Sequence, residues 1–98
     1  MRRSNYYEET LAQELRDKEF AQGFLLDLIE TKDDFTLEEA LKHTIVRMGI
    51  KEFAAKAKVP RSNVSEFLKG KRKLKPETLD LYLKPFGLKT KLVLEKAS

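Results

Sequence analysis

Apolar residues recur at helical spacing along most of this chain. Between residues 6 and 16, Leu11 and Leu15 lie four positions apart, and between residues 17 and 30 the apolar positions fall in pairs spaced by four. A polar stretch at 31–34 then separates these segments from the next. Thr36 begins a third helix, because a threonine three positions before Glu39 forms a capping box. The pattern therefore predicts three helices in the first half of the chain.

Shorter segments follow in the second half. Segments 50–57 and 61–69 each place apolar residues on one helical face, and Lys58-Val59-Pro60 breaks the pattern between them. Gly70 suits a left-handed residue just beyond the second of these helices. Pro76 suits the first position of a further helix, which a proline and a glycine end. The expected fold is mainly α, with five to six helices.

The last apolar segment has a different period. Residues 88, 90, 92 and 94 alternate with Lys89, Lys91 and Val93, which is the pattern of a β-strand. A lone strand leaves its backbone hydrogen-bonding groups unpaired, and the rest of the sequence offers no second strand. We therefore expect this short C-terminal strand to pair with its copy in a homodimer. The side chains expected to form that interface are Leu88, Leu92 and Leu94.

Charge is distributed unevenly along the chain. Residues 1–48 contain 7 Lys/Arg against 11 Asp/Glu, whereas residues 49–98 contain 13 against 5. Within 56–75, 8 basic residues stand against one acid, Glu66. A basic segment is often only a solvated surface, so charge alone leaves solubility and nucleic-acid binding as alternatives. The positions of these charges on the predicted helices favour nucleic acid.

Composition excludes several classes of protein. A chain of 98 residues makes one compact domain, and without cysteine it forms neither disulfides nor thiolate metal sites. No apolar stretch approaches the roughly 20 residues that cross a bilayer, and residues 1–5 precede acids, unlike a signal peptide. We therefore expect a cytoplasmic protein without membrane association. We also expect no cofactor, no metal site and no enzymatic activity, because the single histidine, His43, falls on a polar helix face and no glycine-rich phosphate loop is present.

Segments 50–57 and 61–69 have the anatomy of a helix-turn-helix. Two short helices flank a tight three-residue turn, and Ala54 supplies a small residue where they cross. Val59 and Val64 are the apolar residues that fix the second helix at its angle. Short helices of this kind are common in bundles, so the residue types matter more than the lengths.

Those residue types resemble the lambda-repressor-like proteins of the Cro/Xre type over residues 37–88. The matching positions are Ala54, Val59, Arg61, Val64 and Gly70-Lys71-Arg72. The sequence departs from the family pattern at Lys58, where glycine is usual, and at Pro60 and Pro85. The resemblance implies a lambda-repressor-like bundle whose segment 61–69 enters the major groove of double-stranded DNA.

On that family pattern, five residues of the second helix face the bases: Arg61, Ser62, Asn63, Ser65 and Glu66. Arginine can bind guanine O6 and N7 together, serine can donate or accept, and glutamate can accept from cytosine N4. A less specific interpretation is that Ser62 and Asn63 only cap the helix. Phosphates would be held by amides at a helix start and by the following basic loop, through Ile50, Lys51, Lys69, Lys71, Arg72 and Lys73. A dimer carrying two such motifs would bind a palindromic operator.

The whole chain also resembles the addiction-module antidotes and the host-inhibition-of-growth antitoxins. The shared features are Asp17-Lys18-Glu19-Phe20-Ala21, Met48-Gly49-Ile50 and the C-terminal strand. This resemblance implies a dimeric repressor of its own operon that also neutralises a partner toxin. In that case residues 1–35 are the toxin-binding part and residues 36–98 the DNA-binding part. A stand-alone repressor without a toxin and a protein-interaction module remain the alternatives.

Overall fold

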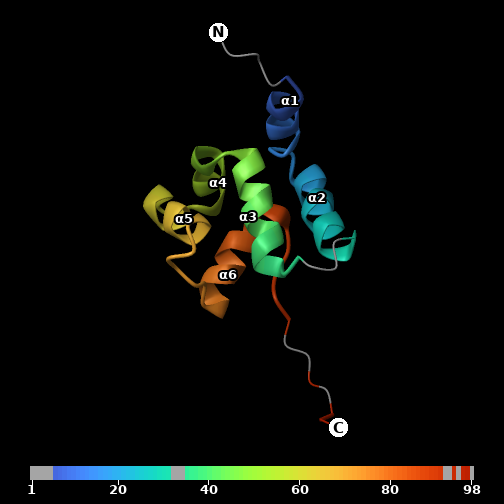
Figure 1. The fold of residues 1–98 in the computed structure, drawn as a ribbon, viewed down its shortest axis with the longest axis vertical. Helices are drawn as coiled ribbons and strands as arrows, with labels where there is room; N and C mark the ends of the chain where they lie inside the picture. Colours follow the sequence, from blue (N-terminus) through green and yellow to red (C-terminus); the bar gives the residue numbers. More distant parts are fainter. Residues whose placement is uncertain (1–5, 32–34, 92–93, 95, 98) are drawn as a thin grey trace.

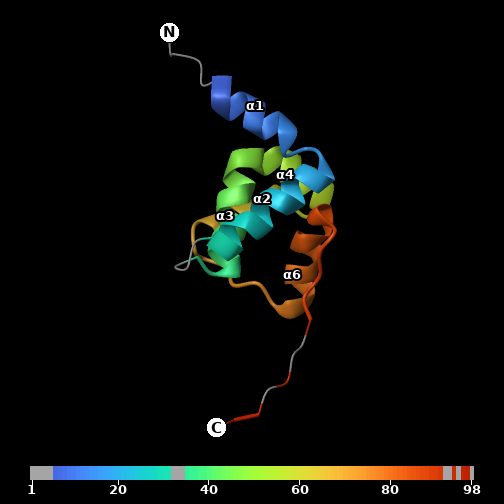
Figure 2. The same ribbon diagram turned by 90° about the vertical axis from the view of Figure 1, so that its right-hand side faces the viewer.

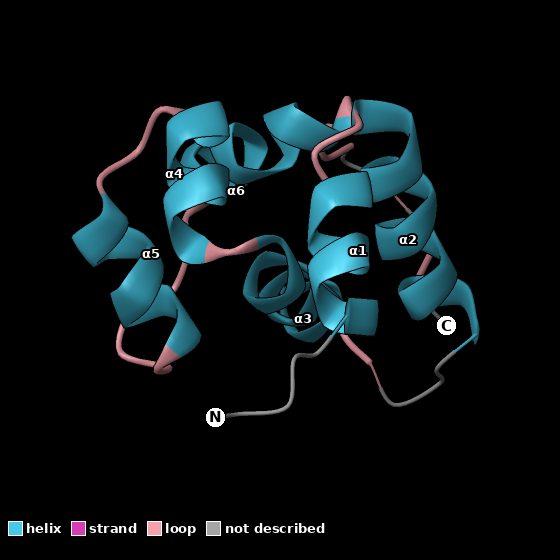
Figure 3. Ribbon diagram, turned by 90° about the horizontal axis from the view of Figure 1, so that it is seen from above, coloured by secondary structure: helices cyan, strands magenta, loops and turns pink. Residues whose placement is uncertain are grey.

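The computed structural model describes residues 6–31, 35–91, 94 and 96–97. The helices in this part of the chain are α1 (Tyr6–Glu14), α2 (Lys18–Thr31), α3 (Leu37–Met48), α4 (Ile50–Ala57), α5 (Arg61–Leu68) and α6 (Pro76–Leu83), followed by the 3₁₀ turn η1 (Lys84–Phe86). The mainly α fold predicted from the sequence is confirmed, and Figure 3 shows helices and loops without a strand in the described residues. None of these helices combines the length and apolarity needed to span a membrane.

The central element is α3, which lies between the two halves of the molecule (Figure 1). Helices α1 and α2 pack against one side of it, and α4 and α5 lie on the other. Helix α6 and η1 close the core beneath α4. This order places α1 and α2 on one side of α3 and the helix-turn-helix on the other.

Helix α3 begins where the sequence predicts. The Thr36 hydroxyl accepts from the Glu39 amide at 3.1 Å, and the Glu39 carboxylate accepts from the Thr36 amide at 3.1 Å. This capping box satisfies backbone donors that a helix start leaves unpaired. At the other end, Gly49 has a φ of 107°, which lets the chain turn directly into α4.

An aromatic cluster forms the core under the helix-turn-helix. Phe53 of α4 and Phe67 of α5 place their ring centroids 5.4 Å and 5.6 Å from that of Tyr82. Phe86 of η1 lies 6.2 Å from Phe53, and all four residues are buried. Since aromatic side chains bury large apolar areas, this cluster fixes α4, α5 and α6 against one another.

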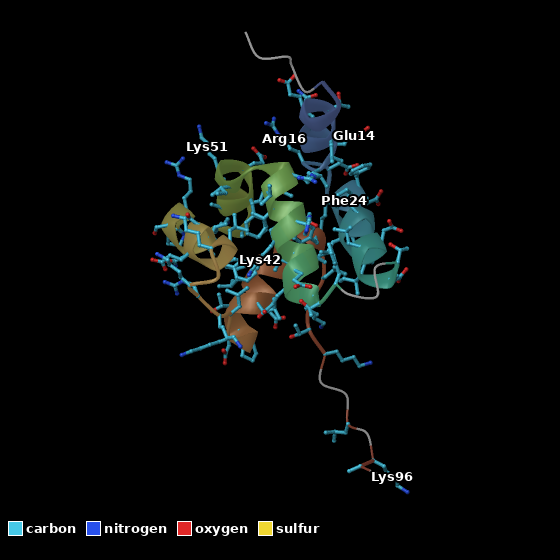
Figure 4. The ribbon with its side chains drawn as sticks, viewed as in Figure 1. Glu14, Arg16, Phe24, Lys42, Lys51 and Lys96 are labelled. Atoms are coloured by element: carbon cyan, nitrogen blue, oxygen red, sulfur yellow. The ribbon has the colours of Figure 1, made fainter. Side chains whose placement is uncertain are left out.

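Helix α2 is joined to the same core. Its Ala21 and Leu25 are fully buried, and Phe24, labelled in Figure 4, packs against the core beside them. The Gln22 amide donates to the Phe86 carbonyl at 2.9 Å, which ties α2 to η1. Between α1 and α2, Arg16 approaches Glu52 of α4 at 3.7 Å.

The C-terminal segment differs from the predicted strand. Residues 88–91 and 94 form no strand, and Leu92 and Val93 lie outside the described residues. Leu88 is half-buried against the core of its own chain, and its place in a subunit interface stays a prediction. Leu94 is 88% exposed.

The physical reason lies in helix α6, along which this segment runs (Figure 2). The Thr90 amide and hydroxyl both donate to Asp80 Oδ1, each at 2.8 Å. These two bonds hold the Asp80 carboxylate in its charged form and lower its pKa. The segment thus finds a hydrogen-bond acceptor on a preceding helix of its own chain. The sequence pattern instead predicts a second strand, from another subunit, as the partner of its backbone groups.

Candidate nucleic-acid interface

Helices α4 and α5 cross over small buried side chains. Ala54 is 4% exposed at the crossing and Val64 is fully buried beneath it, as the sequence predicts. Val59 is half-buried in the turn, and its amide donates to the Ala54 carbonyl at 3.1 Å. Because both helices rest on one packed core, the angle between them is fixed before any ligand binds.

The turn itself contains two departures from the family pattern. Lys58 has φ 60° and ψ 46°, the left-handed conformation expected at a position where glycine is usual. Pro60 adopts φ −65° and ψ 141° immediately before α5, and its carbonyl accepts from the amides of Asn63 and Val64. The proline therefore starts the helix through its fixed φ, and no side chain caps α5. Ser62 and Asn63 do not serve as caps.

Helix α5 turns its polar side chains away from the core. Arg61, Ser62 and Glu66 are exposed, and Asn63 and Ser65 are half-buried. Figure 1 shows α5 at the edge of the molecule, with α3 separating it from α2. The five residues that the sequence assigns to base reading thus share one accessible helix.

Two of these five residues bind Arg72 of the following loop. Arg72 Nη2 and Nε donate to Glu66 Oε1 at 2.9 Å and 3.2 Å, and Nη2 also donates to Asn63 Oδ1 at 3.2 Å. This network leaves no signal in the sequence, because its partners are six and nine residues apart, across a helix end and a turn. A predicted phosphate ligand and two predicted base readers are therefore one bonded unit in the free protein.

The basic loop after α5 folds back on that helix. Gly70 takes the predicted left-handed conformation with φ 78°, and the Lys71 amide donates to the Glu66 carbonyl at 2.9 Å. Lys69, Lys71 and Lys73 are all exposed. Three lysines are thereby gathered at the C-terminal end of α5.

The N-terminus of helix α4 adds backbone amides to the candidate interface. It begins at Ile50 after Gly49, and no side-chain hydrogen bond caps it. The first amides of a helix have no partner within it, so those of Ile50 and Lys51 are available to an acceptor. The Lys51 side chain extends outward from this end of α4 (Figure 4).

One further basic residue lies beside α5 and is not apparent from the sequence. Lys42 of α3 places its Nζ 5.1 Å from the centroid of the Phe67 ring, a cation–π distance. Figure 4 shows Lys42 on α3, next to the helix-turn-helix. The single histidine, His43, is exposed and stacks with Phe35 at 4.8 Å, as expected for a surface residue.

A comparison with protein families supplies a match to this same region. The family model described as Helix-turn-helix matches residues 44–93, half of the chain. The matched range contains α4, the turn, α5, the basic loop and α6. Neither the curated proteins nor the solved structures yielded a match to the chain.

Proposed function

This chain belongs to the helix-turn-helix family of DNA-binding transcriptional regulators, and we propose that it is a repressor that binds a palindromic operator as a homodimer. The observation that carries the proposal is the exposed polar side of α5, flanked by free amides of α4 and by the basic loop. A helix of this kind fits the major groove, and the groups on either side of it fit the two phosphate backbones.

Within this proposal, base edges are contacted by Arg61, Ser62 and Ser65. In the described part of the chain, the side chains of Arg61 and Ser62 form no hydrogen bond or ion pair, so their donors are available to DNA. Phosphates are held by the groups around them, namely Ile50, Lys51, Lys69, Lys71 and Lys73. Phosphate contacts set the register of the protein, and base contacts set its specificity.

The test begins with duplexes selected from a random-sequence pool by the full chain. A dimer should enrich two half-sites about 34–36 Å apart, one turn of DNA. If about six phosphates are neutralised, log K against log salt should have a slope near −5. Failure to enrich any sequence, together with a slope near zero, would contradict the proposal.

Two variants then separate the roles of individual residues. Arg61→Ala should weaken the selected duplex by about 1–3 kcal/mol and barely affect random DNA, because it removes a base contact. Lys71→Ala, in the exposed loop, should weaken both duplexes alike, because it removes a phosphate contact. Equal losses on both duplexes for Arg61→Ala would identify it as another phosphate ligand.

The homodimer is supported by apolar side chains that the single chain leaves exposed near its C-terminus. Leu81 of α6 is 45% exposed and Leu94 is 88% exposed. A chain ending at Thr90 keeps the bonds to Asp80 and should still fold, but should sediment as a monomer. Leu81→Lys should weaken the dimer in the same direction. A full chain that sediments as a monomer and binds its operator would contradict the dimer.

We also propose that the protein is the antitoxin of a two-gene module, as its resemblance to the addiction-module antidotes implies. Exposed residues on α2 support this role, since the helix carries the exposed acids Glu19, Asp27 and Glu30 and also Phe20, which is 38% exposed. Exposed acids together with an exposed aromatic side chain on one helix suit a basic partner protein. The alternative is a stand-alone repressor, for which this surface has no partner.

The antitoxin role is tested with the product of the reading frame beside its gene. Deleting residues 1–35 would remove buried residues of α2, so charge reversal is the better perturbation. Changing Glu19, Asp27 and Glu30 together to lysine should abolish rescue of cells from that product. Glu77→Lys, an exposed acid on α6, is the matched control and should rescue normally. A harmless neighbouring product would favour the stand-alone repressor.

A further inference from the structure

The arginine of the basic loop is held in one orientation on α5. Nε and Nη2 of Arg72 donate to Glu66 Oε1, and Nη2 also donates to Asn63 Oδ1. A guanidinium carries five N–H groups, and these contacts use the one on Nε and both on Nη2. Within the described residues, the two N–H groups of Nη1 have no partner.

This arrangement limits what Arg72 can recognise. A guanidinium binds guanine O6 and N7 through two parallel N–H groups on one edge. Both edges that can do so include Nη2, whose hydrogens already point to Glu66 and Asn63. The remaining nitrogen, Nη1, can donate to a single acceptor group such as a phosphate oxygen.

The same arrangement changes the role expected of Glu66. It is the one acid within 56–75, and it lies on the exposed side of α5. An unpaired carboxylate there would repel DNA phosphates, whereas a carboxylate paired with a guanidinium adds no net charge. Its Oε1 already accepts two N–H groups from Arg72.

We propose that Asn63 and Glu66 are positioning residues, which hold Arg72 so that Nη1 binds a DNA phosphate, and that neither reads a base. This inference rests on the proposed DNA binding and assigns roles within that interface. Asn63 and Glu66 approach the guanidinium from the recognition helix, so Arg72 is ordered before DNA arrives and loses less freedom on binding. The contact fixes register without selecting sequence.

A double-mutant cycle tests this assignment on a duplex selected by the wild-type chain. Arg72→Ala removes a phosphate ligand and leaves Glu66 unpaired, so Kd should rise by about 10–100-fold. Adding Glu66→Ala removes the repulsive carboxylate, so the double variant should bind about three- to tenfold more tightly than Arg72→Ala alone. If Glu66 accepts from a base, the double variant will instead bind more weakly than Arg72→Ala.

Lys71 provides the matched control, because it belongs to the same loop and its side chain does not bind Glu66. Glu66→Ala should change the Kd of the Lys71→Ala chain by the same factor as it changes the wild-type Kd, with no specific rescue. On a random-sequence duplex, the Arg72→Ala loss should match that on the selected duplex. A loss confined to the selected duplex would overturn the phosphate assignment.

Two further measurements separate the possible failures. Thermal unfolding of each variant should give the wild-type midpoint, since the side chains of Glu66, Lys71 and Arg72 lie on the surface. Such midpoints show that each variant is folded. A wild-type chain that binds no DNA contradicts the proposed function. A wild-type chain that binds DNA, with Glu66→Ala failing to improve Arg72→Ala, contradicts only the positioning role.

Discussion

Replacing Lys58 by glycine tests the turn that sets the angle between the two helices of the motif. Lys58 occupies the left-handed region, with φ 60° and ψ 46°, and is the only non-glycine residue with a positive φ in the described residues. Its amide donates to the Ala54 carbonyl, and the next residue, Val59, packs against the core. The backbone on both sides of Lys58 is therefore fixed by this hydrogen bond and by packing. Lys58 must then keep a backbone conformation that crowds its Cβ.

The expected gain follows from two opposing effects. The left-handed conformation costs an L-residue about 1–2 kcal/mol, and glycine avoids this cost. Glycine is also freer in the unfolded chain, which offsets about 0.5–1 kcal/mol of the gain. Lys58→Gly should therefore stabilise the protein by about 0.5–1 kcal/mol. For a domain of this size, that corresponds to a rise in Tm of about 3–6 °C.

Equilibrium unfolding in urea, followed by circular dichroism, measures this difference. Lys58→Ala is the matched control, because it removes the same charge but keeps the Cβ in the left-handed conformation. It should be no more stable than the wild type. A Lys58→Gly chain no more stable than Lys58→Ala would refute the strain argument, since the two variants differ at this residue only in the Cβ.

Four other outcomes follow from the buried Tyr82 and from two glycines on the surface. Tyr82→Phe should stabilise the protein by about 1 kcal/mol in urea unfolding, because the buried Tyr82 hydroxyl has no hydrogen-bond partner within the described residues; a destabilised variant would indicate such a partner. Burial raises the pKa of Tyr82, and the charge of Arg72 partly opposes this effect. The unfolded chain therefore loses the phenolic proton at a lower pH than the folded chain, so the wild-type free energy of unfolding should fall above pH 10 more steeply than that of Tyr82→Phe. Parallel slopes of the two free energies from pH 9 to 11 would contradict this. Gly87→Ala should destabilise by about 1 kcal/mol in the same assay, because φ is 68°, a left-handed conformation that strains a residue with a Cβ. Gly23→Ala, with nothing within 4 Å in helix α2, should stabilise by about 0.5–1 kcal/mol.

The helices and the motif could be predicted because their causes are local. The Thr36–Glu39 capping box needs only a spacing of three residues, and both of its bonds form. The crossing of α4 and α5 needs a small residue and a buried valine, which Ala54 and Val64 supply. Interactions within one helical turn or one short loop leave a pattern that a sequence displays directly.

The C-terminal segment and the Arg72 network could not be predicted, because their causes are tertiary. The alternation over 88–94 is short, and the bonds of Thr90 depend on where α6 places Asp80. Arg72 reaches Glu66 only because the loop turns back at Gly70. Side-chain partners that cross a helix end are set by the path of the loop, and single-sequence periodicity carries no information about that path.

The positions of the acids within the fold explain how a partly acidic chain can bind DNA. Helix α2, which carries exposed acids such as Glu19 and Asp27, lies across α3 from α5 (Figure 1). A helix with its side chains is about 10 Å wide. The Debye length is about 8 Å at physiological salt, so a charge beyond α3 is largely screened from phosphates on α5.

Glu66 has no such separation, because it lies on α5 itself and is paired with Arg72. Charge reversal on α2 should therefore leave DNA affinity nearly unchanged at 0.15 M salt. At about 0.01 M salt, where the Debye length is roughly 30 Å, the same reversal should tighten binding. The double variant at Glu66 and Arg72 should differ in Kd from Arg72→Ala at both salt concentrations. The Arg72→Ala chain keeps the Glu66 carboxylate, which lies within one Debye length of the phosphates. An α2 reversal that tightens binding equally at both concentrations would place those acids at the DNA surface and contradict the separation by α3.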